Sequence, residues 1–285
     1  VVMDADLSHP ATAIPEMVKQ LRNGESDFVL GSRYVEGGSI DESWTLWRYI
    51  NSVVATIPAL PITRVKDPMS GFFAVRKADI PNAYNLSPIG YKIALEVMVK
   101  GDFPTVSEVP IHFVDRIHGE SKLTLTEQLK YLRHLRRLYQ YKFQTKAEFF
   151  QFAFVGASGF IVDLAFYLIL QMFGASHTVA RAISFWPAVT WNWMLNRTIT
   201  FSHREKTKKS TQWGAFASSS LLGFTVNYGT YYTLTKYVPF FEEHMVLALI
   251  VGVLMGMGFN FSISNLFIFK KLREEVDHEK HNKKN

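Results

Sequence analysis

Two aspartates near the N-terminus give the clearest chemical signal in this chain. The apolar run Val1-Val2-Met3 leads directly into Asp4-Ala5-Asp6, and Pro10 closes the segment. A short buried strand followed by a loop has this pattern. Ligands of α/β sheets lie at the carboxyl ends of strands, where two carboxylates and substrate phosphates together can hold Mg²⁺. An isolated Asp-x-Asp is more often an ordinary acidic turn, so the residues that follow must decide.

A second group of candidate residues follows the next strand-like segment, Asp27–Leu30. The turn Gly31-Ser32-Arg33-Tyr34 sets one arginine among small residues at a strand end, which suits an anion. A helical pattern over Trp44–Ile57 then places Arg48 and Ser52 one turn apart on one face. An amphipathic surface helix would show the same pattern.

A third group lies in the loop Val114–Leu123, which reads Val-Asp-Arg-Ile-His-Gly-Glu-Ser-Lys-Leu. It carries Arg116 and Lys122 on either side of a glycine, and two fixed positive charges of this kind can clamp a phosphate. A solvated surface loop is an equally good interpretation of this stretch taken alone.

The elements that must position these residues alternate between the two periodicities of regular structure. Helical spacing covers residues 13–21, 44–57 and 91–100, and strand-like segments cover residues 27–30, 72–75 and 106–114. This alternation predicts an α/β domain in which the candidate residues follow strand ends.

Four motifs in this order resemble the dolichol-phosphate mannose synthases, inverting glycosyltransferases of family 2 with a GT-A fold. They are Asp4-Ala5-Asp6, Gly31–Tyr34, Ser70-Gly71-Phe72 and Val114–Leu123, and the resemblance covers about residues 1–125. It implies transfer of mannose from GDP-mannose to the phosphate of dolichol or another polyprenol, with Mg²⁺ or Mn²⁺ as cofactor.

The resemblance also implies roles for single residues. Asp4 and Asp6 would hold the metal on the donor diphosphate, with Ser8 as a weaker third ligand where the family often has glutamine. The donor or acceptor phosphates would be bound by Arg33, Arg48, Ser52, Arg116 and Lys122, and the catalytic residues would be Asp6, Arg33 and Arg116. Because the acceptor phosphate is already an anionic nucleophile, the reaction needs charge screening and stabilisation of the leaving diphosphate.

A GT-A domain also has a first βαβ half that binds the base and ribose of the donor. Nothing before Val1 can supply that half, so we expect the first half of the fold to be missing from this chain. The sequence therefore does not read out donor specificity.

The second half of the chain has a different composition. Leu125–Phe143 is amphipathic, with leucines at three-residue spacing and flanking lysine, arginine and tyrosine side chains. Such a helix lies on an anionic membrane. A nucleic-acid-binding helix would look similar, but the apolar stretches that follow favour the membrane, and we expect no nucleic-acid partner.

Four apolar stretches cover residues 149–173, 179–201, 213–237 and 245–269. Each is long enough to cross a bilayer, which takes roughly 20 residues. Lysine and arginine concentrate in the 202–212 loop and after Phe269, so the positive-inside rule places residues 1–148, this loop and both termini in the cytoplasm. The predicted domains are a catalytic domain (1–124), an interfacial helix region (125–148), a transmembrane domain (149–270) and a basic tail (271–285).

The transmembrane part contains an internal repeat. Trp191–Phe201 matches Phe259–Phe269 in pattern, and Asp163 parallels Asn227, so a two-helix hairpin is used twice. The pattern resembles the GtrA-like family of four-helix membrane proteins. For Asp163, pairing with an Asn or Arg of a neighbouring helix is the favoured interpretation, and moving or orienting a lipid phosphate is the alternative.

Three other functions compete with mannosyl transfer. A polyprenyl-phosphate glucosyltransferase that uses a UDP-sugar would need the same metal and cations. A processive polysaccharide synthase would carry Gln-x-x-Arg-Trp, a string that does not occur in this sequence. A lipid-phosphate flippase or scaffold would use the membrane half alone.

Overall fold

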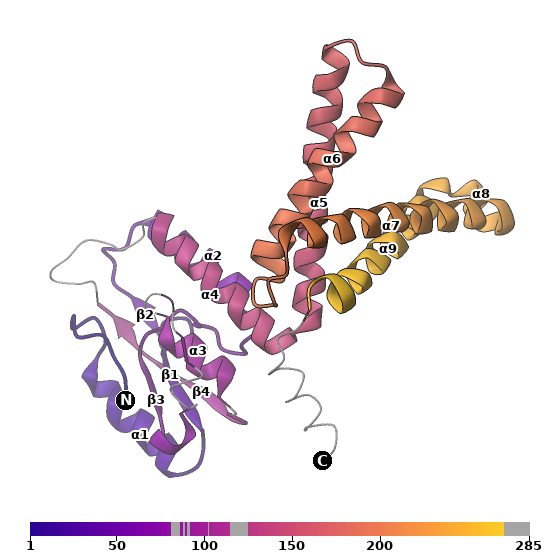
Figure 1. Cartoon of the computed structure of the whole chain (residues 1–285). Coiled ribbons are helices and arrows are strands. Elements are labelled where there is room, and N and C mark those ends of the chain that lie inside the picture. Colours follow the sequence, from indigo (N-terminus) through magenta and orange to yellow (C-terminus); the bar gives the residue numbers. More distant parts are fainter. Residues whose placement is uncertain (81–85, 88, 90–91, 102, 115–124, 271–285) are drawn as a thin grey trace, which may run out of the picture. The chain divides into compact units, whose positions relative to one another are not determined.

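The computed structural model describes residues 1–80, 86–87, 89, 92–101, 103–114 and 125–270 (Figure 1). The chain forms two compact units, Val1–Gln144 and Thr145–Asn285. Arg116 and Lys122, two of the predicted phosphate-binding residues, lie outside the described residues, and so does the predicted basic tail 271–285.

The first unit is built on a three-stranded sheet with the order β3-β1-β4. The central strand β1 (Phe28–Ser32) pairs in parallel with β4 (Val106–Pro110) and antiparallel with β3 (Phe73–Val75). This confirms the predicted strands at residues 27–30 and 72–75. The predicted strand 106–114 is divided, because the chain leaves β4 and then forms β5 (His112–Phe113) against β2 (Ser39–Ile40).

The predicted strand at Val1–Met3 is reduced to a single bridge, in which Val2 pairs antiparallel with Phe73. The N-terminal segment therefore lies beside β3 and runs in the same direction as β1. Since β1 and the N-terminal segment are parallel, their carboxyl ends lie at the same edge of the sheet.

Helices cover both faces of this sheet because the side chains of β1 alternate. On one face Val29 packs with Met17 and Leu21 of α1 (Ile14–Arg22). On the other face Phe28 and Leu30 pack with Ala94 and Val97 of α3 (Ile93–Lys100). The described part of this unit also contains short 3-10 turns, η1 (Ala11–Ala13), η2 (Ile57–Ala59) and η3 (Lys77–Asp79).

The predicted amphipathic helix is α4 (Leu125–Phe143), and it belongs to the core of the first unit. Leu135 and Leu138 are buried in one cluster with Leu95 of α3. The hydroxyl groups of Tyr131 and Tyr139 donate hydrogen bonds of 2.7 and 2.8 Å to the carbonyl groups that end α2 (Leu46–Thr56) and begin η2, those of Ala55 and Pro58.

A second apolar surface remains uncovered within the first unit. It consists of side chains of α2 and α4 that are each more than a third exposed, namely Leu46, Trp47, Ile50, Val54, Leu125, Leu129 and Leu132. We call this set the α2–α4 apolar surface.

The second unit is helical. Its long helices are α5 (Thr145–Met172), α6 (His177–Leu195), α7 (Lys209–Tyr237) and α9 (Met245–Ile263), with the short α8 (Pro239–Glu243) before the last. Among the described residues, α5 and the segment Met245–Ile268 are long and apolar enough to cross a membrane. The other two helices carry more polar side chains and fall below that criterion.

The two halves of the predicted internal repeat pack in a similar way in this unit. Both α6 and α9 continue into a π-helical turn, η5 (Asn196–Thr200) and η6 (Ser264–Ile268). A Cβ on Gly159 would lie 2.1 Å from Oδ1 of Asn192, and one on Gly223 would lie 2.2 Å from Oδ1 of Asn260. In each hairpin, glycine therefore lets a helix approach the asparagine of its partner.

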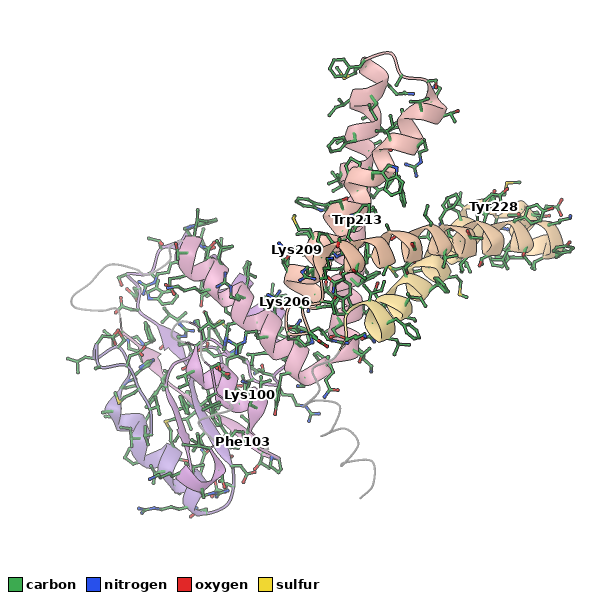
Figure 2. The ribbon with its side chains drawn as sticks, in the orientation of Figure 1. Lys100, Phe103, Lys206, Lys209, Trp213 and Tyr228 are labelled. Atoms are coloured by element: carbon green, nitrogen blue, oxygen red, sulfur yellow. The ribbon has the colours of Figure 1, made fainter. Side chains whose placement is uncertain are left out.

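A buried ion pair lies near the start of α5 in the second unit. Nη2 of Arg204 donates to both carboxylate oxygens of Glu148 at 2.7 Å, and Nη1 donates to the carbonyls of Asn265 and Phe269. Arg204 belongs to the loop 202–212 that is rich in lysine and arginine, but its side chain is 3 % exposed and neutralised by Glu148. The exposed cations of this loop include Lys206 and Lys209, near Trp213 at the start of α7 (Figure 2).

Candidate functional site

Four segments of the first unit meet at one edge of its sheet. Two of them, Asp4–His9 and Arg33–Tyr34, follow parallel segments. Asp67–Gly71 precedes β3, which runs the opposite way, so it reaches the same edge. The fourth segment ends at Val114, whose N–H donates to the carbonyl of Ser8 at 3.2 Å. Strand directions alone thus bring the predicted residues of the N-terminal motif and Arg33 to one place.

The aspartate motif forms a loop closed by its own hydrogen bonds. The N–H of Ser8 donates to Oδ1 of Asp6 at 3.1 Å, and the N–H of Asp4 donates to Nδ1 of His9 at 3.3 Å. The carboxylate of Asp4 is exposed beside Gly71, where an added Cβ would stand 3.4 Å from Oδ2. A small side chain at this position would therefore make an ordinary van der Waals contact with the Asp4 carboxylate.

His9 supports this loop and was not predicted from the sequence. Its ring packs against Phe72 and Phe113, with centroid distances of 5.2 and 5.4 Å. Burial lowers the pKa of His9, and this effect outweighs the opposing charges of Asp4 and Asp6. The imidazole is therefore neutral at pH 7, with Nδ1 free to accept the hydrogen bond from Asp4.

The carboxylates suit a metal that also binds the substrate. In the part of the chain that the structure describes, no three His, Asp or Glu side chains are grouped closely enough to hold a metal by themselves. Mg²⁺, however, commonly binds one or two carboxylates and takes its other ligands from substrate phosphates and water. Asp4 and Asp6 fit that donor set. Ser8 is 1 % exposed, and its Oγ has no hydrogen-bond partner among the described residues.

Arg33 is held by a second acidic residue, Asp67. Nε and Nη2 of Arg33 donate to the two carboxylate oxygens at 2.8 Å, and the backbone N–H of Arg33 donates to Oδ2 at 3.0 Å. The two side chains are 9 % and 0 % exposed. Burial alone would lower the pKa of Arg33, but the hydrogen bonds and charge of Asp67 outweigh it and raise the pKa.

The backbone around Asp67 is itself held by Glu108. The N–H groups of Lys66 and Asp67 donate to the carboxylate of Glu108 on β4, at 2.8 and 3.1 Å. Asp67 was not predicted from the sequence as a partner of Arg33. The signal was an aspartate directly before a turn that leads into a strand, which is too common to identify a pair.

Arg48 and Ser52 lie on α2, and each contacts an aromatic side chain that is also near Arg33. The hydroxyl of Tyr34 donates to Oγ of Ser52 at 2.8 Å, and the guanidinium of Arg48 lies 4.1 Å from the ring centroid of Trp44. Arg33 also stacks near this ring, at 5.7 Å. A hollow of about 510 Å³ opens here, lined by Arg33, Tyr34, Ser39, Ile40, Asp41, Glu42, Trp44, Leu46 and Tyr49.

Lys92, like His9 and Asp67, was not predicted from the sequence. Its ammonium donates to the carbonyl of Met69 at 3.2 Å. Burial, followed by the charge of Arg33, lowers the pKa of Lys92 to about 8, while Asp67 and Asp4 act in the opposite direction. A lysine before a helix carries no special signal, because its environment arises only when the chain folds.

Comparison with known proteins gives matches in both units of the chain. Residues 1–81 match the model of glycosyl transferase family 2, and residues 151–269 match that of the GtrA/DPMS transmembrane domain. A dolichol-phosphate mannosyltransferase of Pyrococcus furiosus is 34 % identical over 268 residues, which are 93 % of this chain and 74 % of the relative. The chain belongs to the dolichol-phosphate mannosyltransferase family.

Two fungal members of the family match a shorter part of the chain. The protein from Mycosarcoma maydis is 43 % identical over 148 residues, and that from Saccharomyces cerevisiae is 37 % identical over 177 residues. The matches cover 51 % and 60 % of this chain, and 50 % and 61 % of those relatives. The predicted architecture of a family 2 glycosyltransferase domain followed by a GtrA-like membrane domain is therefore confirmed.

Proposed function

We propose that this protein transfers mannose from GDP-mannose to a polyprenyl phosphate such as dolichyl phosphate. The observation that carries the proposal is the 34 % identity to a protein named dolichol-phosphate mannosyltransferase across 93 % of the chain, which includes both units. In the transfer, an oxygen of the lipid phosphate attacks the anomeric carbon of mannose, and the bond from that carbon to GDP breaks.

Asp4 and Asp6 would hold Mg²⁺ or Mn²⁺ on the donor diphosphate, with Ser8 as a weaker ligand. The bound metal would neutralise the charge that develops on the leaving diphosphate. Because the lipid phosphate is already an anion, no side chain has to remove a proton from it. What the chain must supply is a cationic surface that lets two anions approach.

Arg33 and Arg48, with Ser52, are the described candidates for that surface. Asp67 occupies two nitrogens of the Arg33 guanidinium and so fixes the plane of the group. Arg116 and Lys122 are proposed to complete the phosphate-binding set, with Arg116 and Arg33 closest to the reacting atoms together with Asp6.

The acceptor would reach this site from the membrane. The α2–α4 apolar surface belongs to the same unit as Arg33 and Arg48, and it suits contact with lipid. We propose four membrane spans, with the first unit and both termini on the cytoplasmic side.

A donor comparison tests this function. The protein in maltoside micelles is given dolichyl phosphate with either GDP-mannose or UDP-glucose, and glycosylated lipid is measured by mass spectrometry. We expect mannosyl lipid from GDP-mannose. Glucosyl lipid formed from UDP-glucose, with none from GDP-mannose, would contradict the proposed donor and keep the chemistry. No glycolipid from either donor would contradict the proposed activity.

A further inference from the structure

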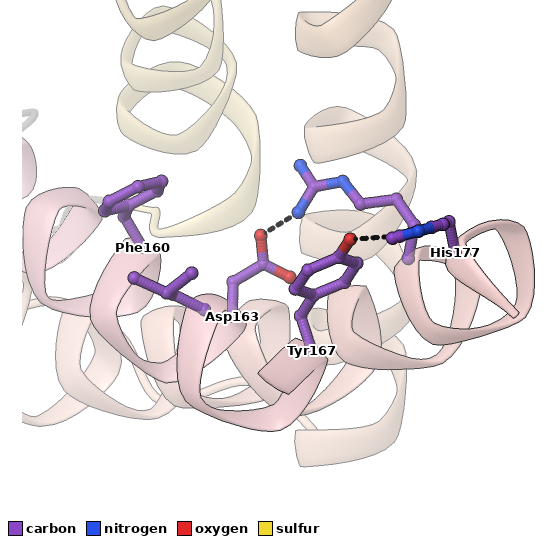
Figure 3. A pocket seen from close by; sticks show the side chains of 6 residues that line it. Phe160, Asp163, Tyr167 and His177 are labelled. Carbon is purple, nitrogen blue, oxygen red and sulfur yellow. Dashed lines mark hydrogen bonds and ion pairs between the residues drawn. The ribbon is translucent and has the colours of Figure 1, made fainter. Parts of the chain in front are cut away.

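A pocket that includes charged side chains lies within the first hairpin of the second unit. Its volume is about 340 Å³, and it is lined by Phe160, Asp163, Leu164, Tyr167, His177 and Arg181 (Figure 3). Asp163 is separated from Glu148, at the start of α5, by fifteen residues, or about 22 Å of helix rise. The pocket therefore lies in the half of the hairpin nearest the α5–α6 loop.

Asp163 directs the guanidinium of Arg181 toward this pocket. Oδ2 of Asp163 accepts a hydrogen bond from Nη1 of Arg181, and Oδ1 accepts one of 2.7 Å from the hydroxyl of Ser184. The Asp163 side chain is 13 % exposed, whereas that of Arg181 is 66 % exposed. Both carboxylate oxygens of Asp163 are thus hydrogen-bonded within the protein. The guanidinium of Arg181, which they orient, lines the pocket.

His177 supplies a second donor. Its Nδ1 lies 2.7 Å from the hydroxyl of Tyr167, a contact drawn in Figure 3. The same atom lies 2.5 Å from Nε2 of Gln171. The amide nitrogen of Gln171 can only donate, so Nδ1 of His177 accepts in this arrangement and Nε2 is left to donate to a ligand.

The second hairpin shows that packing alone does not require these charges. In the repeat, the positions of Asp163, Arg181 and Ser184 are occupied by Asn227, Leu249 and Gly252. A Cβ on Gly252 would lie 2.7 Å from Oδ1 and from the carbonyl oxygen of Asn227. At this depth the two helices of the second hairpin therefore pack through neutral residues and close backbone contact. The two helices of the first hairpin are instead joined by an ion pair.

Ionisable groups inside membrane helices are costly and commonly mark a functional site. The pocket offers an oriented guanidinium and an imidazole N–H, which are donors that suit a phosphate. Phe160 and Leu164, 65 % and 43 % exposed, add apolar surface beside these donors. We infer that this pocket binds the phosphate headgroup of a lipid, with Arg181 and His177 as donors and the lipid chain along Phe160 and Leu164.

The test uses the full chain in maltoside micelles, which contain no phosphate. A photoreactive farnesyl phosphate with a diazirine in its prenyl chain is added, and labelled peptides are mapped by mass spectrometry. Labelling of α5 and α6 is counted separately from labelling of residues 1–144, where a second phosphate site is proposed. Farnesol with the same diazirine measures labelling that does not depend on phosphate.

The informative variant is the double substitution Asp163→Asn/Arg181→Leu, which places the residues of the second hairpin in the first. It is charge-neutral, so it avoids an unpaired charge inside the membrane. The matched control is Lys236→Gln, which removes a cation from the loop end of the second hairpin, where Lys236 contacts Tyr232.

We expect the double substitution to reduce labelling of α5 and α6 by about tenfold or more, as expected for loss of a charge-assisted hydrogen bond. Lys236→Gln should leave this labelling unchanged, and labelling within residues 1–144 should be unchanged in both variants. Equal labelling of α5 and α6 in wild type and the double variant, or equal labelling by farnesol, would overturn the inference.

Competition distinguishes the source of the phosphate. Displacement of the probe by both phosphatidylglycerol and unlabelled farnesyl phosphate would support a site for any lipid phosphate. Displacement by farnesyl phosphate alone would support a site for a terminal phosphate monoester. Displacement by farnesol as effective as that by farnesyl phosphate would overturn the inference.

Discussion

At the scale of single residues, the Arg33–Asp67 pair connects stability with the proposed chemistry. Asp67 makes three hydrogen bonds to Arg33, and Glu108 fixes the backbone of Asp67 in turn. A guanidinium held in one plane presents its remaining N–H groups in a fixed direction. A lysine at the same place would present a point charge without that direction.

We predict that Asp67→Asn lowers the free energy of unfolding by roughly 3–5 kcal/mol, because a buried arginine then has no countercharge. Thermal unfolding in detergent measures this change. Asp79→Asn is the control, because Asp79 pairs with Arg76 at the surface and should contribute little. Equal effects of the two substitutions would show that burial of the Arg33–Asp67 pair does not matter.

The lowered pKa of Lys92 predicts that the activity depends on pH. With a pKa of about 8, its ammonium is charged below that pH and neutral above it. If this charge helps to hold the donor diphosphate near Asp4, kcat/KM for the donor should fall as the pH rises through about 8. Lys92→Arg should move the fall to higher pH, because arginine stays protonated. An unchanged profile in Lys92→Arg would assign the fall to another group.

Some of the candidate residues could be predicted from the local sequence pattern alone. Asp4, Asp6 and Arg33 follow strand-like segments, and strand direction brings those segments together. His9, Asp67 and Lys92 were missed because their roles depend on neighbours that are distant in sequence. Arg116 and Lys122 lie outside the described residues, so their roles remain predictions.

At the scale of elements, α4 has two apolar faces rather than one. The sequence predicted an amphipathic helix, and its bounds agree with the structure at Leu125 and Phe143. Leu135 and Leu138 pack into the core of the first unit, while Leu129 remains 66 % exposed on the α2–α4 apolar surface. Leucine spacing alone could not separate the two faces, because it does not show what packs against each.

Substitutions on the two faces should therefore act differently. Leu129→Glu is expected to lower transfer to long-chain lipid in membranes by about tenfold, because burial of one leucine in lipid is lost. Transfer to a short, soluble prenyl phosphate should change little. Leu138→Ala should instead destabilise the protein by about 2–5 kcal/mol. If Leu129→Glu lowered transfer to both acceptors equally, we would conclude that this face does not contact lipid.

The helices of the second unit were also predicted, and their endings were not. Hydrophobic length gave four helices and the repeat, but the π-helical turns η5 and η6 arise where each hairpin meets the rest of the bundle. There Phe201 stacks on Phe269 with a centroid distance of 4.5 Å. That contact joins the two repeats, so neither half of the sequence predicts it alone.

At the scale of the whole molecule, the proposed catalytic site and the helices of the GtrA/DPMS transmembrane domain belong to different compact units. A version that ends after Gln144 should keep measurable transfer to a short prenyl phosphate. Transfer to long-chain lipid in membranes should fall by roughly a hundredfold or more, because anchoring raises the local concentration of the acceptor. If the shortened protein folds and binds donor but uses neither acceptor, the membrane unit shapes the site.

We propose that Asp4 and Asp6 place a metal-bound donor diphosphate at the edge of the sheet. The most direct test is mannosyl transfer measured against Mg²⁺ or Mn²⁺ concentration in wild type, Asp4→Ala and Asp6→Ala. We predict that wild-type transfer requires the metal and that each substitution lowers kcat/KM by roughly a hundredfold or more. Membrane insertion should be unchanged. An Asp6→Ala protein that stays active with the same metal dependence would contradict the account.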